Sequence, residues 1–187
     1  MTRLTALSLT AVAALAFLAG CEQQPDPNVK KVLEACLAVS AADATGILGQ
    51  PLTANKMSGD DAPISICSYN DPSNGSVGLV KLQSADKITD ALANLNSDQE
   101  MLKGVYKGNV KPVVARTADG FGPGAFYMDI TPGLGAIEVQ MYAIQDGYKL
   151  SVVVNQSKDF PTAEKQAAGL ANKVFENIKN GQAFQPQ

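Results

Sequence analysis

Histidine and tryptophan are both absent from this chain of 187 residues. The usual serine and cysteine hydrolases need an imidazole, and so do most zinc sites. We therefore expect no catalytic activity of these kinds, no metal and no cofactor. The acidic residues between positions 59 and 74 also fit no calcium-loop spacing. Hydrolysis by carboxylates alone stays open as an alternative, although no carboxylate pair stands out in the sequence.

Arginine is scarce, and runs of like charge are missing. Arg3 and Arg116 are the two arginines, within a total of 15 basic and 18 acidic residues that interleave along the chain. A protein that binds nucleic acid needs a basic stripe to displace counterions from phosphate. We therefore expect no nucleic-acid partner. The 45% of apolar residues predicts instead one folded domain with a core of its own.

The N-terminus has the layout of an export signal. After Arg3, an apolar stretch over 4–18 is too short to span a bilayer comfortably, and Leu18-Ala19-Gly20-Cys21 follows it. These four residues closely resemble the lipobox of bacterial lipoproteins. The resemblance implies that residues 1–20 are a signal peptide and that Cys21 carries acyl chains such as palmitate. An ordinary signal peptide or an uncleaved anchor with an incidental cysteine is the alternative.

A lipidated Cys21 would make the bilayer the protein's first partner. Two or three acyl chains hold a protein far more firmly than one, because each buried methylene contributes about 0.8 kcal/mol. Glu22 favours the outer membrane, facing the periplasm, if the organism is Gram-negative. We expect a lipidated tether over 21–28, a single domain over 29–181 and a polar tail over 182–187.

Two cysteines remain once Cys21 is assigned to lipid. Cys36 and Cys67 would lie in an oxidising compartment, so we expect a disulfide between them. A loop of this length predicts a stabilisation of roughly 3–4 kcal/mol in the chain-entropy model. A redox-active or metal-binding pair is the alternative, but neither cysteine lies in a C-x-x-C motif.

Hydrophobic periodicity predicts ten elements in the order α-α-β-β-α-β-β-β-β-α. The fold class is therefore α+β, with one antiparallel sheet of about five or six strands and helices packed on it. Residues 53–63 are expected to form a loop. Alternation of Glu138, Gln140 and Tyr142 with apolar residues predicts that one sheet face is solvated. The expected helices cover 29–37, 40–49, 86–102 and 162–180, and the strands cover 64–69, 76–83, 110–115, 125–130, 136–144 and 148–155.

Local signals add detail to these elements. Ser40 and Asp43 are expected to form a capping box, and Gly49 to end that helix. Asp146-Gly147 predicts a tight hairpin turn. Leu37 is expected on the inner face of the first helix. The last helix is expected to turn seven apolar residues inward: Ala163, Ala167, Leu170, Ala171, Val174, Phe175 and Ile178.

The segment from Gly120 to Gly124 is the most unusual in the chain. It carries three glycines and precedes a strand, whereas a phosphate-binding loop would precede a helix and carry a lysine. We interpret it as a tight turn that lets Phe126 enter the core while Tyr127 faces out. The functional alternative is a flexible lip beside an apolar pocket, with Phe121, Phe126 and Tyr127 as ligand contacts.

Several short motifs together resemble a known group of proteins. They are Cys36-Leu37, Ser40-Ala41-Ala42-Asp43, Cys67-Ser68-Tyr69 and the Gly120–Gly124 loop, all downstream of the lipobox. The pattern is similar to small envelope lipoproteins of unknown function, best represented in actinobacteria, and to related extracellular sensor domains, some with PsbP-like folds. Pro123 departs from the acidic residue expected there. The resemblance implies a disulfide between an early helix and the first strand, and no catalytic residues.

These observations predict a non-enzymatic binding module in the cell envelope. We expect it to bind a small apolar ligand or a partner protein. A structural accessory of an envelope complex, without a ligand pocket, is the alternative of a different class.

Overall fold

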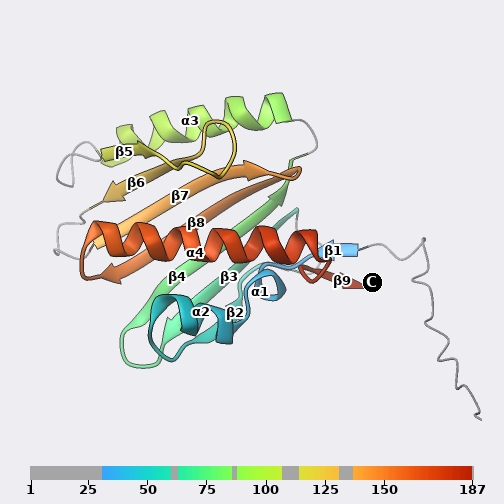
Figure 1. Cartoon of the computed structure of the whole chain (residues 1–187), viewed down its shortest axis with the longest axis vertical. Coiled ribbons are helices and arrows are strands. Elements are labelled where there is room, and N and C mark those ends of the chain that lie inside the picture. The colour runs from blue at the N-terminus through green and yellow to red at the C-terminus, as the bar shows by residue number, and fades with distance from the viewer. Residues whose placement is uncertain (1–30, 60–62, 86–87, 107–113, 131–136, 187) are drawn as a thin grey trace, which may run out of the picture.

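The structure is a computed structural model that describes residues 31–59, 63–85, 88–106, 114–130 and 137–186 (Figure 1). Residues 1–30, with Cys21 and the predicted tether, lie outside the described part. The helices are α1 (Ala35–Ala38), α2 (Ala41–Leu48), α3 (Ile88–Tyr106) and α4 (Phe160–Lys179). The strands are β1 (Lys31–Leu33), β2 (Thr53–Lys56), β3 (Ile64–Asp71), β4 (Gly75–Ser84), β5 (Val114–Thr117), β6 (Phe126–Ile130), β7 (Ile137–Gln145), β8 (Tyr148–Ser157) and β9 (Phe184–Pro186).

The predicted α+β class with an antiparallel sheet is confirmed. Seven strands form one sheet in the order β2-β3-β4-β8-β7-β6-β5, and every neighbouring pair is antiparallel. A second sheet joins β1 to β9, so the two ends of the described chain lie side by side. The number and order of strands differ from the prediction, because β1, β2 and β9 were not expected.

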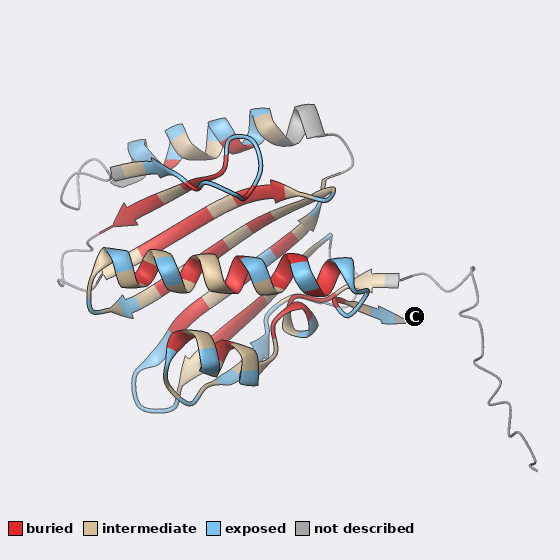
Figure 2. Cartoon of the chain, in the orientation of Figure 1, coloured by how far each residue is buried: buried red, intermediate tan, exposed pale blue. Residues whose placement is uncertain are grey.

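α4 crosses one face of the large sheet and buries its apolar stripe there (Figure 2). The helix begins where the Asp159 carboxylate accepts a hydrogen bond from the Thr162 amide at 2.7 Å. Its inner face is the one predicted from the sequence. Its seven predicted inward residues are all buried: Ala163, Ala167, Leu170, Ala171, Val174, Phe175 and Ile178. The helices α1 and α2 lie on the same face, beside α4.

α3 packs on the opposite face, over β6 and β7. Side chains alternate across a strand, so Phe126 and Met128 point toward α3 while Tyr127 points toward α4. Leu95 and Leu102 of α3 meet these residues in a separate, smaller cluster. The helix continues to Tyr106, beyond the point near Leu102 where its apolar pattern fades.

The first predicted helix is wrong in its start and its orientation. Residues 31–33 form β1, and α1 begins only at Ala35, where the Glu34 carboxylate accepts from the Cys36 amide at 3.3 Å. Leu37 was expected on the inner face but is 42% exposed. A four-residue helix has too few turns to form a stripe, and pairing with β9 extends the preceding residues instead.

The remaining predictions from the sequence are confirmed in some places and wrong in others. The capping box of Ser40 and Asp43 is present, and Gly49 ends α2 in the left-handed region as expected. The predicted 53–63 loop contains β2 because register with β3 overrides its polar composition. The polar row on β7 is less solvated than predicted, since Gln140 is only 8% exposed. The predicted polar tail contains β9.

Candidate functional site

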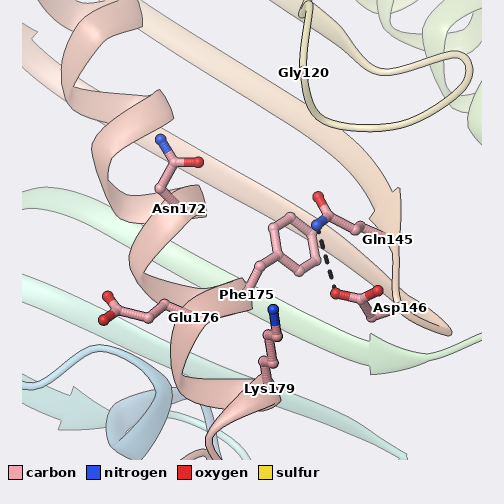
Figure 3. Close-up of a pocket in the computed structure, with 7 residues that line it drawn as sticks. All are labelled: Gly120, Gln145, Asp146, Asn172, Phe175, Glu176 and Lys179. Atoms are coloured by element: carbon pink, nitrogen blue, oxygen red, sulfur yellow. Dashed lines mark hydrogen bonds between the residues drawn. The ribbon is translucent and has the colours of Figure 1, made fainter.

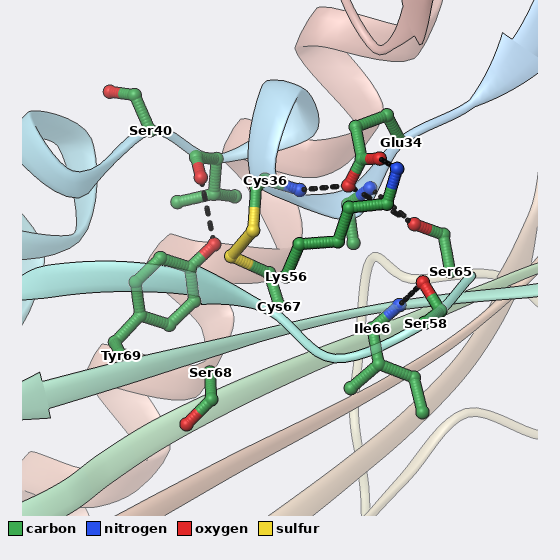
Figure 4. The surroundings of a disulfide bond; sticks show 12 residues. Glu34, Cys36, Ser40, Lys56, Ser58, Ser65, Ile66, Cys67, Ser68 and Tyr69 are labelled. Carbon is green, nitrogen blue, oxygen red and sulfur yellow. Dashed lines mark hydrogen bonds and ion pairs between the residues drawn. A yellow bond between two sulfur atoms is a disulfide. The ribbon is translucent and has the colours of Figure 1, made fainter. Parts of the chain in front are cut away.

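The predicted disulfide is confirmed. Cys36 of α1 and Cys67 of β3 are bonded, with their Cα atoms 5.1 Å apart (Figure 4). Cys67 is fully buried, and the bond therefore fixes α1 to the centre of the β3 strand. Because both sulfurs are engaged, the alternative of a free redox or metal-binding pair is not favoured by this geometry.

Polar side chains complete the attachment of α1. The buried Glu34 carboxylate pairs with Lys56 of β2 at 2.6 Å (Figure 4). The Glu34 backbone amide donates to the Ala183 carbonyl at 2.8 Å. At the other end of α1, the Asn177 side chain donates to the Ala38 carbonyl at 2.9 Å. A one-turn helix cannot satisfy its own terminal groups, so these partners stabilise the region where the chain enters the fold.

Tyr69 belongs to the same structural cluster. Its hydroxyl donates to the Val39 carbonyl at 2.8 Å, and its side chain is fully buried. Burial raises the pKa of this phenol, and the charges of Asp43 and Glu34 raise it further. Tyr69 is therefore a neutral hydrogen-bond donor that caps α1, and we assign it a structural role.

The loop between β5 and β6 passes around the edge of the sheet. Phe121 is buried with the α4 cluster, whereas a side chain at Gly124 would contact Leu92 of α3 at 3.3 Å. Gly122 has a positive φ of 89°, and a Cβ there would lie 2.4 Å from the Ile144 carbonyl oxygen. No other residue fits this approach, so the glycines serve a close turn that joins the two layers.

A groove of about 530 Å³ lies between this loop, the β7–β8 turn and the last two turns of α4 (Figure 3). Its helical members are spaced i, i+3, i+4 and i+7, which places them on one face of α4. Gly120 borders the groove from the loop, and the turn places Asp146 at the rim with a positive φ of 53°. The lining residues are Gly120, Gln145, Asp146, Asn172, Phe175, Glu176 and Lys179.

Charges of both signs meet in this groove around one aromatic ring. Figure 3 shows the side chains of Gln145, Asp146 and Lys179 gathered around Phe175. The Phe175 side chain is only 5% exposed and closes the bottom of the groove. The Glu176 carboxylate lies 3.4 Å from the Lys173 ammonium. Figure 3 shows the Glu176 side chain pointing away from Phe175. The arrangement suits hydrogen bonding and ion pairing with a polar ligand.

Arg116 lies at a different place and bridges two carboxylates. Its guanidinium donates to Asp129 of β6 and to Glu164 of α4 on the α4 face. Burial raises the pKa of Asp129, although Arg116 opposes the shift. Burial and then the charge of Asp129 raise the pKa of Glu164. Asp129 Oδ1 is buried, and no described residue donates a hydrogen bond to it.

This carboxylate pair does not line the groove, and each member shares the Arg116 guanidinium. A carboxylate hydrolase needs one acid free to protonate a leaving group and a second free to attack or to activate water. The bridging arginine engages an oxygen of each acid instead. Among the described residues, no group of three or more acidic, cysteine or histidine side chains could hold a metal ion.

The three aromatic residues predicted as ligand contacts do not share one cavity. Phe121 is buried in the α4 cluster, and Tyr127 packs against that cluster with its pKa raised chiefly by burial. Phe126 is buried on the other face, stacked on Tyr142 with ring centroids 5.0 Å apart. The predicted tight turn with Phe126 in the core is present, whereas Tyr127 is half-buried rather than turned outward.

The groove was not predicted, although two of its parts carry local sequence signals. Asp146-Gly147 was expected to form a tight turn, and it does. The polar residues at 172, 176 and 179 repeat at helical spacing beside the buried stripe. The third part, Gly120, reaches the groove only because the loop passes around the sheet edge, and no local pattern predicts that contact.

No protein-family model matches the chain, and no curated protein matches it by sequence. Among the described residues, no helix is long and apolar enough to cross a membrane. A solved structure, the extracellular domain of PknH from Mycobacterium tuberculosis, is similar with a TM-score of 0.52 and 12% identity. The match covers 79% of this chain and 98% of that domain. This chain therefore has a fold similar to that of the PknH extracellular domain.

Proposed function

We propose that the protein is a lipid-anchored binding module of the cell envelope that holds a small polar ligand in the groove at the C-terminal end of α4. The observation that carries the proposal is the groove itself, which combines both signs of charge, amide groups and an aromatic floor in about 530 Å³. Pockets of this size commonly hold small molecules through a few convergent polar groups. The polar lining favours a polar ligand over the apolar one expected from the sequence.

Export and anchoring support this proposal. The Cys36–Cys67 disulfide fits an oxidising compartment, and the lipobox-like sequence at Cys21 fits acylation. The similar fold of an extracellular domain is consistent with the same side of the membrane. Changing Cys21 to Ser should move the protein from the membrane fraction to the soluble fraction. Continued labelling by a fatty-acid probe would refute the anchor.

Native mass spectrometry tests ligand binding. The detergent-extracted protein from its own host should carry a small molecule that is lost in Asn172→Trp, because an indole at this exposed position blocks the groove. Lys165→Trp is the matched control, since it adds the same side chain to an exposed position of α4 that does not line the groove. A wild-type protein without any bound molecule would overturn the proposed function.

A partner protein is a second candidate, favoured by the sheet face opposite α4. Ile66, Leu79 and Val153 are half-buried on this face, and α3 is the described helix that packs there, over β6 and β7. Their partial exposure is modest, and the exposed large apolar residues are scattered elsewhere. The groove therefore remains the first candidate.

A further inference from the structure

The groove lies at the end of the domain where the chain enters the fold. Leu33 of β1 is opposite Phe184 of β9, which follows α4 after a short turn. The Phe184 ring contacts the Tyr148 ring edge-on, with centroids 6.2 Å apart. Tyr148 is two residues beyond Asp146 at the groove rim. One end of the molecule therefore holds the groove, the C-terminal strand and the first described residues (Figure 1).

The length of the segment before β1 limits how far this end can lie from a lipid on Cys21. Nine residues, 22–30, separate Cys21 from Lys31. Fully extended, they would reach about 30 Å. The 20 residues of α4 also span about 30 Å. The opposite end of the domain could touch the bilayer only if the segment ran back along the whole helix.

We infer that the groove opens onto the bilayer surface and takes a lipid headgroup that carries both an ammonium and a phosphate. This inference depends on the lipidation of Cys21 and on the ligand site proposed above. It adds the direction from which the ligand comes and its chemical class.

The charges in the groove favour a zwitterionic headgroup. Asp146 offers a carboxylate to an ammonium, and Lys179 offers an ammonium to a phosphate. The third charged residue of the lining, Glu176, is paired with Lys173. A ligand with a single charge would pair with either Asp146 or Lys179. The other of these two groups would then face a like charge or have no partner in the ligand. The Phe175 ring lies between them and is almost fully buried.

Fluorescence quenching tests the orientation, because the chain contains no tryptophan. Gln182→Trp places an indole beside the groove end, and Lys158→Trp places one before the N-terminus of α4; both positions are exposed. With the acylated protein in vesicles that carry a headgroup-linked nitroxide, Gln182→Trp should be quenched several-fold more than Lys158→Trp. Equal or reversed quenching would overturn the inference. Failure of the protein to float with vesicles would instead contradict the anchor.

Hydrogen exchange of the acylated protein tests the ligand class in vesicles of two different lipid compositions. Phosphatidylethanolamine should slow exchange of the amides at 145–147 and 172–179 several-fold relative to pure phosphatidylglycerol. Asp146→Asn with Lys179→Met should abolish the difference, whereas Lys165→Met, an exposed lysine outside the groove, should keep it. Equal exchange in both vesicles would contradict a zwitterionic ligand. Full protection by soluble glycerophosphoethanolamine alone would overturn the bilayer as its source.

Discussion

Three helices, a disulfide and both ends of the described chain meet on or beside the α4 face of the sheet, whereas α3 is the described helix on the opposite face. The α4 side has a continuous core that reaches from β3 to the β5–β6 loop. The α3 side has a much smaller cluster over β6 and β7. The groove is therefore built on the side of the sheet that has the larger core.

The largest difference between the two sheet faces should appear when one buried leucine on each face is changed to alanine. Leu170 of α4 and Leu95 of α3 are both fully buried. Leu170→Ala should lower the free energy of unfolding by about 2–5 kcal/mol and speed hydrogen exchange throughout the domain. Leu95→Ala should speed exchange mainly in α3 and the strands beneath it, because a small cluster can open locally. Equal acceleration of all segments by Leu95→Ala would show that the two faces unfold as one unit.

Removing the disulfide should have the next largest effect. A double change of Cys36 and Cys67 to Ser should lower the free energy of unfolding by about 3–4 kcal/mol, measured by denaturant titration under non-reducing conditions. Exchange in α1 and β3 should rise before exchange in α3 does. A loss confined to the α3 side would contradict the view that the disulfide fixes the α4 side.

The stability of the protein should be sensitive to a substitution at Gly122, in the loop between β5 and β6. Gly122→Ala should destabilise the protein by about 1–3 kcal/mol in denaturant titration, because the added Cβ meets the Ile144 carbonyl at positive φ. Gly120→Ala is the matched control, since its φ of 86° is similar but no atom lies within 4 Å of the added Cβ. Equal destabilisation by both changes would assign the effect to backbone strain alone.

The smallest effect on stability should come from lowering the pH, through the cluster formed by Arg116, Asp129 and Glu164. Because the pKa values of Asp129 and Glu164 are raised, the folded state binds protons that the unfolded state does not. Their contribution to stability is therefore fully present below the ordinary value of 3.8 and is lost as the pH rises through the raised values. The combined changes Asp129→Asn and Glu164→Gln should remove this slope.

The melting temperatures of the wild type and of this double variant are measured across pH 3–7. The difference between the two melting temperatures at each pH isolates the contribution of Asp129 and Glu164. Other groups shift in the opposite direction: hydrogen bonds from Ser73 and Thr162 lower the pKa values of Asp71 and Asp159. Their contributions cancel in the difference. A difference that does not change with pH would contradict the assignment to Asp129 and Glu164.

Local sequence signals predicted those elements whose structure depends on near neighbours. The Ser40–Asp43 capping box, the Asp146-Gly147 turn and the apolar stripe of α4 each depend on residues within a few positions. The disulfide followed from the number of cysteines and the compartment. Pairing of β1 with β9 joins residues from the two ends of the described chain, so no local pattern could indicate it.

The candidate site was missed for a related reason. Phe121, Phe126 and Tyr127 were grouped because they lie close in sequence, but strand alternation and the passage of the loop around the sheet edge separate them. The groove instead gathers residues from three elements, of which the loop contributes only Gly120. Tertiary arrangement decides which face each side chain reaches, and sequence distance does not.

We propose that the end of the domain at the C-terminus of α4 is the end that binds a ligand. The decisive measurement is hydrogen exchange of the protein in membrane vesicles from its own host, compared with detergent-extracted protein stripped of bound molecules. We predict slower exchange in the vesicles at 145–147 and 172–179, where the groove lies. Protection confined to segments outside the groove, such as β3 and β4, or no protection anywhere, would contradict this proposal.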